Sequence, residues 1–146
     1  MEGIRARGEL CLLAGDLNKH VGCGKLVVPG NNREVSLGGR LLRDLLDTRN
    51  WTLVNGMGQQ VVRGGPFTRK DPATNNMSCL DLFVVSRELL PYVKELFIDS
   101  EREYAVSRAV RTGNGHKLVY SDHFSCLLTL TDLPRVKERR EEKQVT

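Results

Sequence analysis

The sequence predicts an α/β protein in which helices flank a mixed sheet in layers. Short apolar, strand-like runs alternate with a clear helical segment along the chain. Stretches rich in Gly, Asn and Pro separate these runs, which is typical of loops. A chain of 146 residues with 40% hydrophobic and 27% charged residues suits one soluble domain with a substantial core. A layered α/β domain is therefore expected.

The first half of the chain predicts one helix and two strands. Residues 9–14 form an apolar run that is expected to be a buried strand, and a loop should follow at residues 19–37. Residues 39–48 have helical periodicity, because their leucines recur on one face. Residues 51–55 have strand chemistry, whereas residues 61–76 predict a hairpin or loop with a brief strand. The leucines of the helical face are Leu41, Leu42, Leu45 and Leu46.

The second half predicts several strands and a charged tail. The strands are expected at residues 80–86, 94–99, 104–111 and 124–131. A short helix is expected at residues 87–93, where Pro91 limits its length. His116 is expected to lie in a loop. Beyond Pro134 the sequence has almost no apolar content, so the domain is expected to span residues 1–133 and a solvated tail residues 134–146.

Charge and cysteine usage limit the possible partners and cellular compartment. A net charge of +4 weakly favours a polyanionic partner. The four cysteines form no CxxC pair, so a zinc site is disfavoured and a reducing compartment is expected. No apolar stretch approaches the length of a membrane span, and the first ten residues lack a signal-peptide core. We expect an intracellular protein of the nucleus or cytoplasm with no membrane partner.

Three polar motifs lie at the ends of apolar runs. They are Gly15-Asp16-Leu17-Asn18, Ser78-Cys79-Leu80-Asp81 and Ser121-Asp122-His123. In α/β folds, strand ends bring catalytic groups together from distant parts of the chain. Asp16 and Asn18 are two positions apart, so their side chains lie on the same face of an extended segment. Asp81 follows a leucine in a strand-like run, where a carboxylate costs several kcal/mol unless a partner satisfies it.

The order, spacing and flanking residues of these motifs resemble the endonuclease/exonuclease/phosphatase superfamily, which includes DNase I. The closest resemblance is to the endonuclease domains of non-LTR retrotransposons. It covers residues 10–133 and corresponds to the C-terminal half of the family domain. The resemblance implies a truncated form of the DNase I-like α/β sandwich. The family's N-terminal half, which carries a metal-binding Glu, has no counterpart in this sequence.

The resemblance implies Mg²⁺-dependent hydrolysis of phosphodiester bonds and a catalytic role for four residues. In the family, the Asp that matches Asp16 orients and activates the attacking water, and the Asn that matches Asn18 holds this water or the phosphate. The residue that matches His123 contacts the scissile phosphate. The Asp that matches Asp81 forms a hydrogen bond with this His, so Asp81 is expected to orient His123.

The resemblance also implies a metal ligand and DNA contacts. Asp122 matches a residue that assists metal binding or the local hydrogen-bond network. Mg²⁺ or Mn²⁺ is expected to bind weakly, because the family's Glu is missing. Asn55, Thr68 and Arg69 occupy places where family members contact DNA.

Three functions remain open from the sequence. The first is a DNA endonuclease that nicks one strand. The second is a non-catalytic, truncated remnant that acts as a binding or assembly module. Phosphatase activity on small or lipid substrates is disfavoured, because inositol-phosphatase members carry Trp-Cys-Asp-Arg where this chain has residues 78–81. A homodimer or a partner subunit that replaces the missing half is also expected, because apolar strands would otherwise face water.

Overall fold

The computed structural model of the chain describes residues 9–17, 36–105 and 107–134. These residues form strands, one α-helix and two short 3-10 helices, so the expected α/β class is confirmed in general terms. Most of the expected loop at residues 19–37 lies outside the described residues, as does the tail beyond Pro134. The one described α-helix is not long and apolar enough to cross a membrane.

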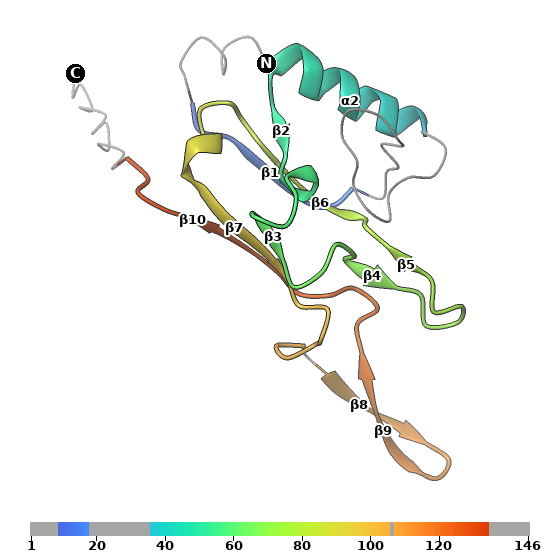
Figure 1. Cartoon of the computed structure of the whole chain (residues 1–146). Coiled ribbons are helices and arrows are strands. Elements are labelled where there is room, and N and C mark those ends of the chain that lie inside the picture. Colours follow the sequence, from blue (N-terminus) through green and yellow to red (C-terminus); the bar gives the residue numbers. More distant parts are fainter. Residues whose placement is uncertain (1–8, 18–35, 106, 135–146) are drawn as a thin grey trace, which may run out of the picture.

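The first sheet has three strands in the order β1-β6-β2 (Figure 1). Its central strand β6 (Asp81–Val85) pairs antiparallel with β1 (Leu12–Asp16) and with β2 (Thr52–Leu53). The apolar sequence of β6 explains its place, because a central strand is covered on both faces. In the first sheet, β1 is an edge strand.

The second sheet has the strand order β10-β7-β3 and mixes two pairing directions. The central strand β7 (Val93–Ile98) pairs antiparallel with β10 (Cys126–Leu130) and parallel with β3 (Val62–Arg63). The expected mixed sheet is thus present, although the strands are divided between two sheets.

Two hairpins extend from these sheets. The shorter one joins β4 (Arg69–Lys70) to β5 (Met77–Ser78). The longer one joins β8 (Ser107–Thr112) to β9 (Gly115–Tyr120), and Figure 1 shows it projecting away from the rest of the described structure. This hairpin differs from the expected loop at His116, because residues 116–120 pair with the preceding strand.

Helix α2 (Leu37–Arg49) confirms the helical periodicity and begins two residues before the expected start. The Ser36 hydroxyl caps it by accepting a hydrogen bond from the Gly39 N–H. Asn50 ends it in the left-handed conformation, with φ of 52°. Its buried residues include Leu42 and Leu46.

The first sheet lies between helix α2 and the second sheet. One core cluster joins the leucines of α2 to Leu53, Leu82 and Val84 of the first sheet. A second cluster joins Val85, on the opposite face of β6, to Leu96 and Ile98 of the second sheet. Because strand side chains alternate between faces, β6 contributes to both clusters.

Three expected elements differ in the structure. Residues 9–14 were expected to be buried, but Leu12 in β1 is 48% exposed because β1 is an edge strand. The short helix expected at residues 87–93 is reduced to a 3-10 helix, η2 (Leu90–Tyr92), which leads directly into β7. The strand expected at residues 51–55 ends at Leu53, where the 3-10 helix η1 (Val54–Gly56) begins.

Candidate active site

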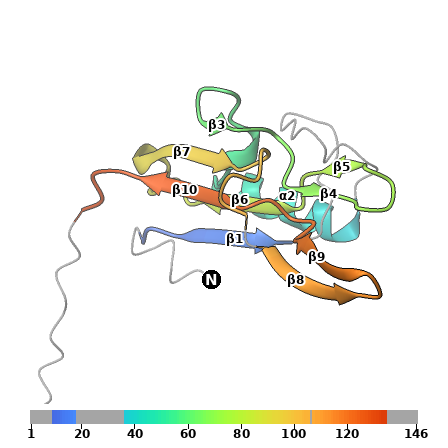
Figure 2. The same ribbon diagram turned by 90° about the horizontal axis from the view of Figure 1, so that it is seen from below.

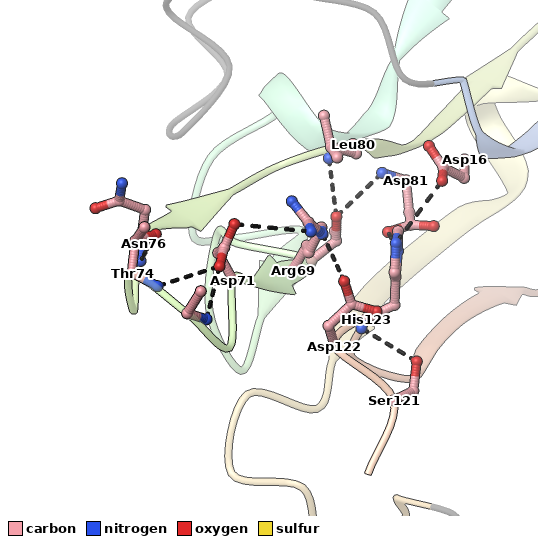
Figure 3. Close-up of polar contacts among 12 residues, drawn as sticks. Asp16, Arg69, Asp71, Thr74, Asn76, Leu80, Asp81, Ser121, Asp122 and His123 are labelled. Atoms are coloured by element: carbon pink, nitrogen blue, oxygen red, sulfur yellow. Dashed lines mark hydrogen bonds and ion pairs between the residues drawn. The ribbon is translucent and has the colours of Figure 1, made fainter. Parts of the chain in front are cut away.

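The centre of the site is a hydrogen bond between His123 and Asp81, which lie 42 positions apart in the sequence (Figure 3). The His123 Nδ1 atom lies 2.7 Å from Oδ2 of Asp81, the first residue of β6. An ionised carboxylate only accepts hydrogen bonds, so Nδ1–H is the donor and the ring is held in one orientation. The expected pairing of these two side chains is confirmed.

Asp16 lies on the other side of the His123 ring. It is the last residue of β1 and is directly opposite Asp81 in the sheet register. Its Oδ2 atom is 3.7 Å from Nε2 of His123, and its side chain is 47% exposed. One water molecule can lie within hydrogen-bond distance of both groups across this gap, and it can donate to the Asp16 carboxylate. Asp16, Asp81 and His123 therefore meet at one end of the first sheet, as expected.

Thr68 fixes the backbone on which Asp81 is carried. It is fully buried, and its hydroxyl oxygen accepts hydrogen bonds from the N–H groups of Leu80 and Asp81, both at 3.0 Å. The Thr68 carbonyl accepts a 2.7 Å hydrogen bond from the Phe124 N–H. This one residue thus links the start of β6 to the segment that carries His123.

Asn55 supports the same strand from η1. Its amide nitrogen donates to the Asp81 carbonyl at 3.0 Å, and its amide oxygen accepts from the Phe83 N–H at 2.8 Å. Only 5% of Asn55 is exposed. The sequence predicted DNA contacts for Asn55 and Thr68, but both side chains are buried and bonded within the chain. The structure gives them the role of positioning β6.

Arg69 is bound to a neighbouring acid. Its Nε donates to Oδ2 of Asp122 at 2.8 Å, and Asp71 lies 3.9 Å from the guanidinium. The hydrogen bond from Arg69 holds the pKa of Asp122 below its ordinary value, and the same bond raises the pKa of Arg69. Arg69 was expected to contact DNA, and its side chain is 29% exposed.

The described donor set does not form a closed Mg²⁺ site. Among the described residues, no group of three or more His, Cys, Asp or Glu side chains is arranged to hold a metal ion. Asp122, the expected metal ligand, is bound to Arg69, and Asn18 lies outside the described residues. Mg²⁺ in phosphoryl-transfer sites often has only one or two carboxylate ligands and takes others from the substrate phosphate.

Two of the cysteines offer no nucleophile near the site. Burial raises the pKa of Cys79 to about 12 and that of Cys126 to about 12. Both thiols therefore stay protonated at neutral pH, whereas a thiolate would be needed for attack.

Sequence reasoning missed the Arg69–Asp122 pair and the internal roles of Thr68 and Asn55. The only signal for the latter was the position of two polar residues beside apolar strand-like runs, which also fits exposed strand ends. Compared with known proteins, the sequence matches no protein-family model and no curated protein. A functional assignment therefore depends on the geometry of the site.

Proposed function

We propose that this site hydrolyses phosphodiester bonds in DNA, as a nicking endonuclease of the kind carried by non-LTR retrotransposons. The observation that carries the proposal is the row Asp81–His123–Asp16, with its outer carboxylate exposed to solvent. A histidine oriented by one carboxylate and facing a second one suits a reaction that needs a phosphate contact and an activated water.

The residues of the chain divide the reaction between them. Asp16 accepts a proton from the attacking water, and Asn18 helps to hold this water. The water oxygen forms a bond to phosphorus while one ester P–O bond breaks, and the leaving oxygen takes a proton from solvent. When both ring nitrogens of His123 are protonated, Nε2–H donates to a phosphoryl oxygen while Asp81 holds Nδ1–H. Mg²⁺ or Mn²⁺, when bound, neutralises charge on the phosphoryl oxygens.

The layering supports a DNase I-like fold for this proposed enzyme. Helix α2, the first sheet and the second sheet follow one another, and the site lies where β1 ends and β6 begins. This order is compatible with part of a sandwich in which two sheets pack face to face between helices.

A non-catalytic binding or assembly module is the second candidate. The observation that favours it is the lack of a three-ligand metal cluster among the described residues. A module of this kind would keep the Asp81–His123 pair as a structural link between β6 and the segment before β10.

Nicking of supercoiled plasmid DNA with added Mg²⁺ separates the two candidates. We expect nicking by the unsubstituted chain and loss of nicking in His123→Ala, because the substitution removes the group that contacts the phosphate. Lys94→Ala, at an exposed position in β7, is the control and should retain activity. Nicking that survives in His123→Ala, or no nicking by any variant, would reject the enzyme.

Metal affinity gives an independent prediction. Because the described side chains do not form a closed site, we expect Mg²⁺ to bind more weakly than micromolar in the absence of DNA. Isothermal titration calorimetry measures this directly. A micromolar or tighter dissociation constant would contradict the prediction and imply further metal ligands. A loss of affinity in Asp122→Asn would then show that Asp122 is one of them.

A further inference from the structure

The β8–β9 hairpin has no packing role in the core. Neither core cluster includes any residue between Ser107 and Tyr120. Every residue of this hairpin except Val119 is exposed, and Figures 1 and 2 show both strands extending away from the sheets. Burial of apolar surface therefore does not explain why the chain forms this hairpin.

The charge on the hairpin has a single sign. It carries Arg108, Arg111 and Lys117 but no acidic residue between Ser107 and Tyr120. Within the described part of the chain, none of the three basic side chains forms an ion pair. Arg108 and Lys117 lie on one face of the hairpin and Arg111 on the other, as the strand register requires. Positive charge is thus available on both faces.

The base of the hairpin is fixed beside the candidate active site. Strand β9 ends at Tyr120, immediately before the segment Ser121-Asp122-His123. Arg102 stabilises the connection between β9 and this segment, because its Nη1 donates a hydrogen bond to the Ser121 carbonyl at 2.7 Å. The guanidinium also lies 5.6 Å from the ring centre of Tyr120 and 5.1 Å from that of Phe124, at cation–π distance. A ligand bound at the base of the hairpin therefore lies next to His123.

The dimensions of the hairpin fit duplex DNA. Each strand has six residues, which corresponds to roughly 20 Å of reach at about 3.3 Å per residue. This length spans about six base pairs at about 3.4 Å per pair. The major groove admits a two-stranded β-ribbon, and basic side chains on both faces can reach phosphates on both walls of the groove.

We propose that the β8–β9 hairpin is a DNA-binding arm that holds duplex DNA beside the site through Arg108, Arg111 and Lys117. This inference rests on the proposed function for the identity of the ligand, but it concerns binding and not cleavage. Three observations support it. The basic side chains form no ion pair within the described residues, the hairpin has no acidic residue, and the Ser121 carbonyl at its base is held by Arg102. A single-stranded RNA would be a different ligand, and the experiment distinguishes it from duplex DNA.

The test measures binding of the full chain to a fluorescent duplex of about 20 base pairs in EDTA, where metal-dependent cleavage does not occur. In the arm variant, Arg108, Arg111 and Lys117 are each changed to Gln. The slope of log K against log salt is negative, and each lost phosphate contact reduces its absolute value by about one. We expect the arm variant to bind at least tenfold more weakly at low salt. The absolute value of its slope should be smaller by about three.

The matched control removes the same charge elsewhere. Arg40, Arg87 and Lys94 are exposed outside the hairpin, and changing all three to Gln lowers the net charge equally. We expect this variant to retain most of the affinity and slope. Equal losses in the two variants would overturn the proposal, because they would show a general charge effect.

Three other results would also overturn the proposal. They are a lack of duplex binding by the unsubstituted chain, an unchanged slope in the arm variant, and tighter binding of single-stranded RNA than of duplex DNA. Circular dichroism checks the folding of each variant. If the triple variant unfolds, Arg111→Gln alone should still reduce the absolute value of the slope by about one. Because binding is measured without nicking, a failed arm and a failed enzyme give different results.

Discussion

The side chains of Asp81 and Asp122 each have a partner that explains their position in the site. Asp81 is only 19% exposed, and the His123 ring lies within hydrogen-bond distance of its carboxylate. Asp122 accepts from Arg69 in the same way. An unpaired charge is costly at a position as little exposed as that of Asp81, so the His123 ring fixes this carboxylate, whereas the Arg69 guanidinium orients the more exposed Asp122. The site is therefore sensitive to single substitutions that keep the shape but change the charge.

Asp81→Asn tests the orienting role of the carboxylate. The amide is neutral and can donate to Nδ1, which favours the wrong tautomer of His123. We expect plasmid nicking to fall by about 10²- to 10⁴-fold, as when an orienting Asp is replaced in a hydrolase triad. Asp44→Asn makes the same chemical change on the exposed side of α2 and should leave nicking unchanged. Equal activity of the two variants would remove the orienting role.

Arg69→Gln tests the cause of the lowered pKa of Asp122. Without the hydrogen bond from Arg69, the pKa of Asp122 should rise towards the ordinary value, near 3.9. A carboxyl group with a depressed pKa in the folded state stabilises the protein above its ordinary pKa and loses this effect as the pH falls through the depressed one. The stability difference between the wild type and Arg69→Gln should therefore shrink in acid.

NMR titration of the side-chain carboxyl carbons measures the pKa of Asp122, and urea unfolding at pH 7 and pH 3 measures the stability difference. Both are done without metal. An unchanged pKa in Arg69→Gln would show that another group lowers it. A stability difference that grows in acid would contradict the linkage.

At the scale of elements, polar side chains supply hydrogen bonds to the backbone at the start of β6. They do so beyond the point where the pairing between β2 and β6 ends. Thr68 and Asn55 supply hydrogen bonds to the backbone of residues 80–83, although neither is part of the first sheet's ladder at this point. Buried backbone N–H groups need partners, so these side chains replace a missing neighbouring strand.

Thr68→Val tests this role with almost no change in shape. The N–H groups of Leu80 and Asp81 lose their acceptor inside the core. We expect the free energy of unfolding to fall by about 2–6 kcal/mol, since two buried N–H groups lose their acceptor and each unsatisfied buried group costs about 1–3 kcal/mol. Thr68→Ser keeps the hydroxyl and removes one methyl group, so it should cost only about 0.8 kcal/mol. Urea denaturation compares them, and equal losses would indicate a packing effect instead.

The strong elements could be predicted from the sequence because their patterns are local. The four leucines of α2 repeat at helical spacing, and β6 and β7 have continuous or alternating apolar residues. The β8–β9 hairpin was only half predicted, because both of its strands are exposed and carry no clear pattern of buried residues. Strand pairing in such a hairpin depends on its turn, not on the core.

The site could be predicted in part. Asp81 was recognisable as an acid beside an apolar run, and its partner followed from the resemblance to a family. The burial of Thr68 and Asn55 could not be predicted, because the same residues suit exposed strand ends and DNA contacts. Arg69 and Asp122 are 53 positions apart, and their pairing depends on the bridge between Arg69 and His123 that the tertiary fold creates.

At the scale of the whole molecule, β1 leaves an apolar edge open. Figure 2 shows β1 at the rim of the described structure, and within that structure no strand pairs with its outer edge. Leu12 is 48% exposed and Leu13 is 38% exposed, and they point to opposite faces. Edge strands of monomers usually carry charges, bulges or covering segments, whereas the only charged residue of β1 is Asp16 at its end.

We therefore expect the edge of β1 to be covered by a second copy of the chain or by a partner subunit. For the purified chain we expect a homodimer, with a mass twice the 16.4 kDa of one chain in light scattering at micromolar concentration. Leu12→Lys places a charge in this edge and should give monomers. Leu41→Lys changes a leucine that is 62% exposed on α2 and should leave the dimer intact. A stable, folded monomer of the unsubstituted chain would contradict the prediction, because β1 would then tolerate exposure of its apolar edge.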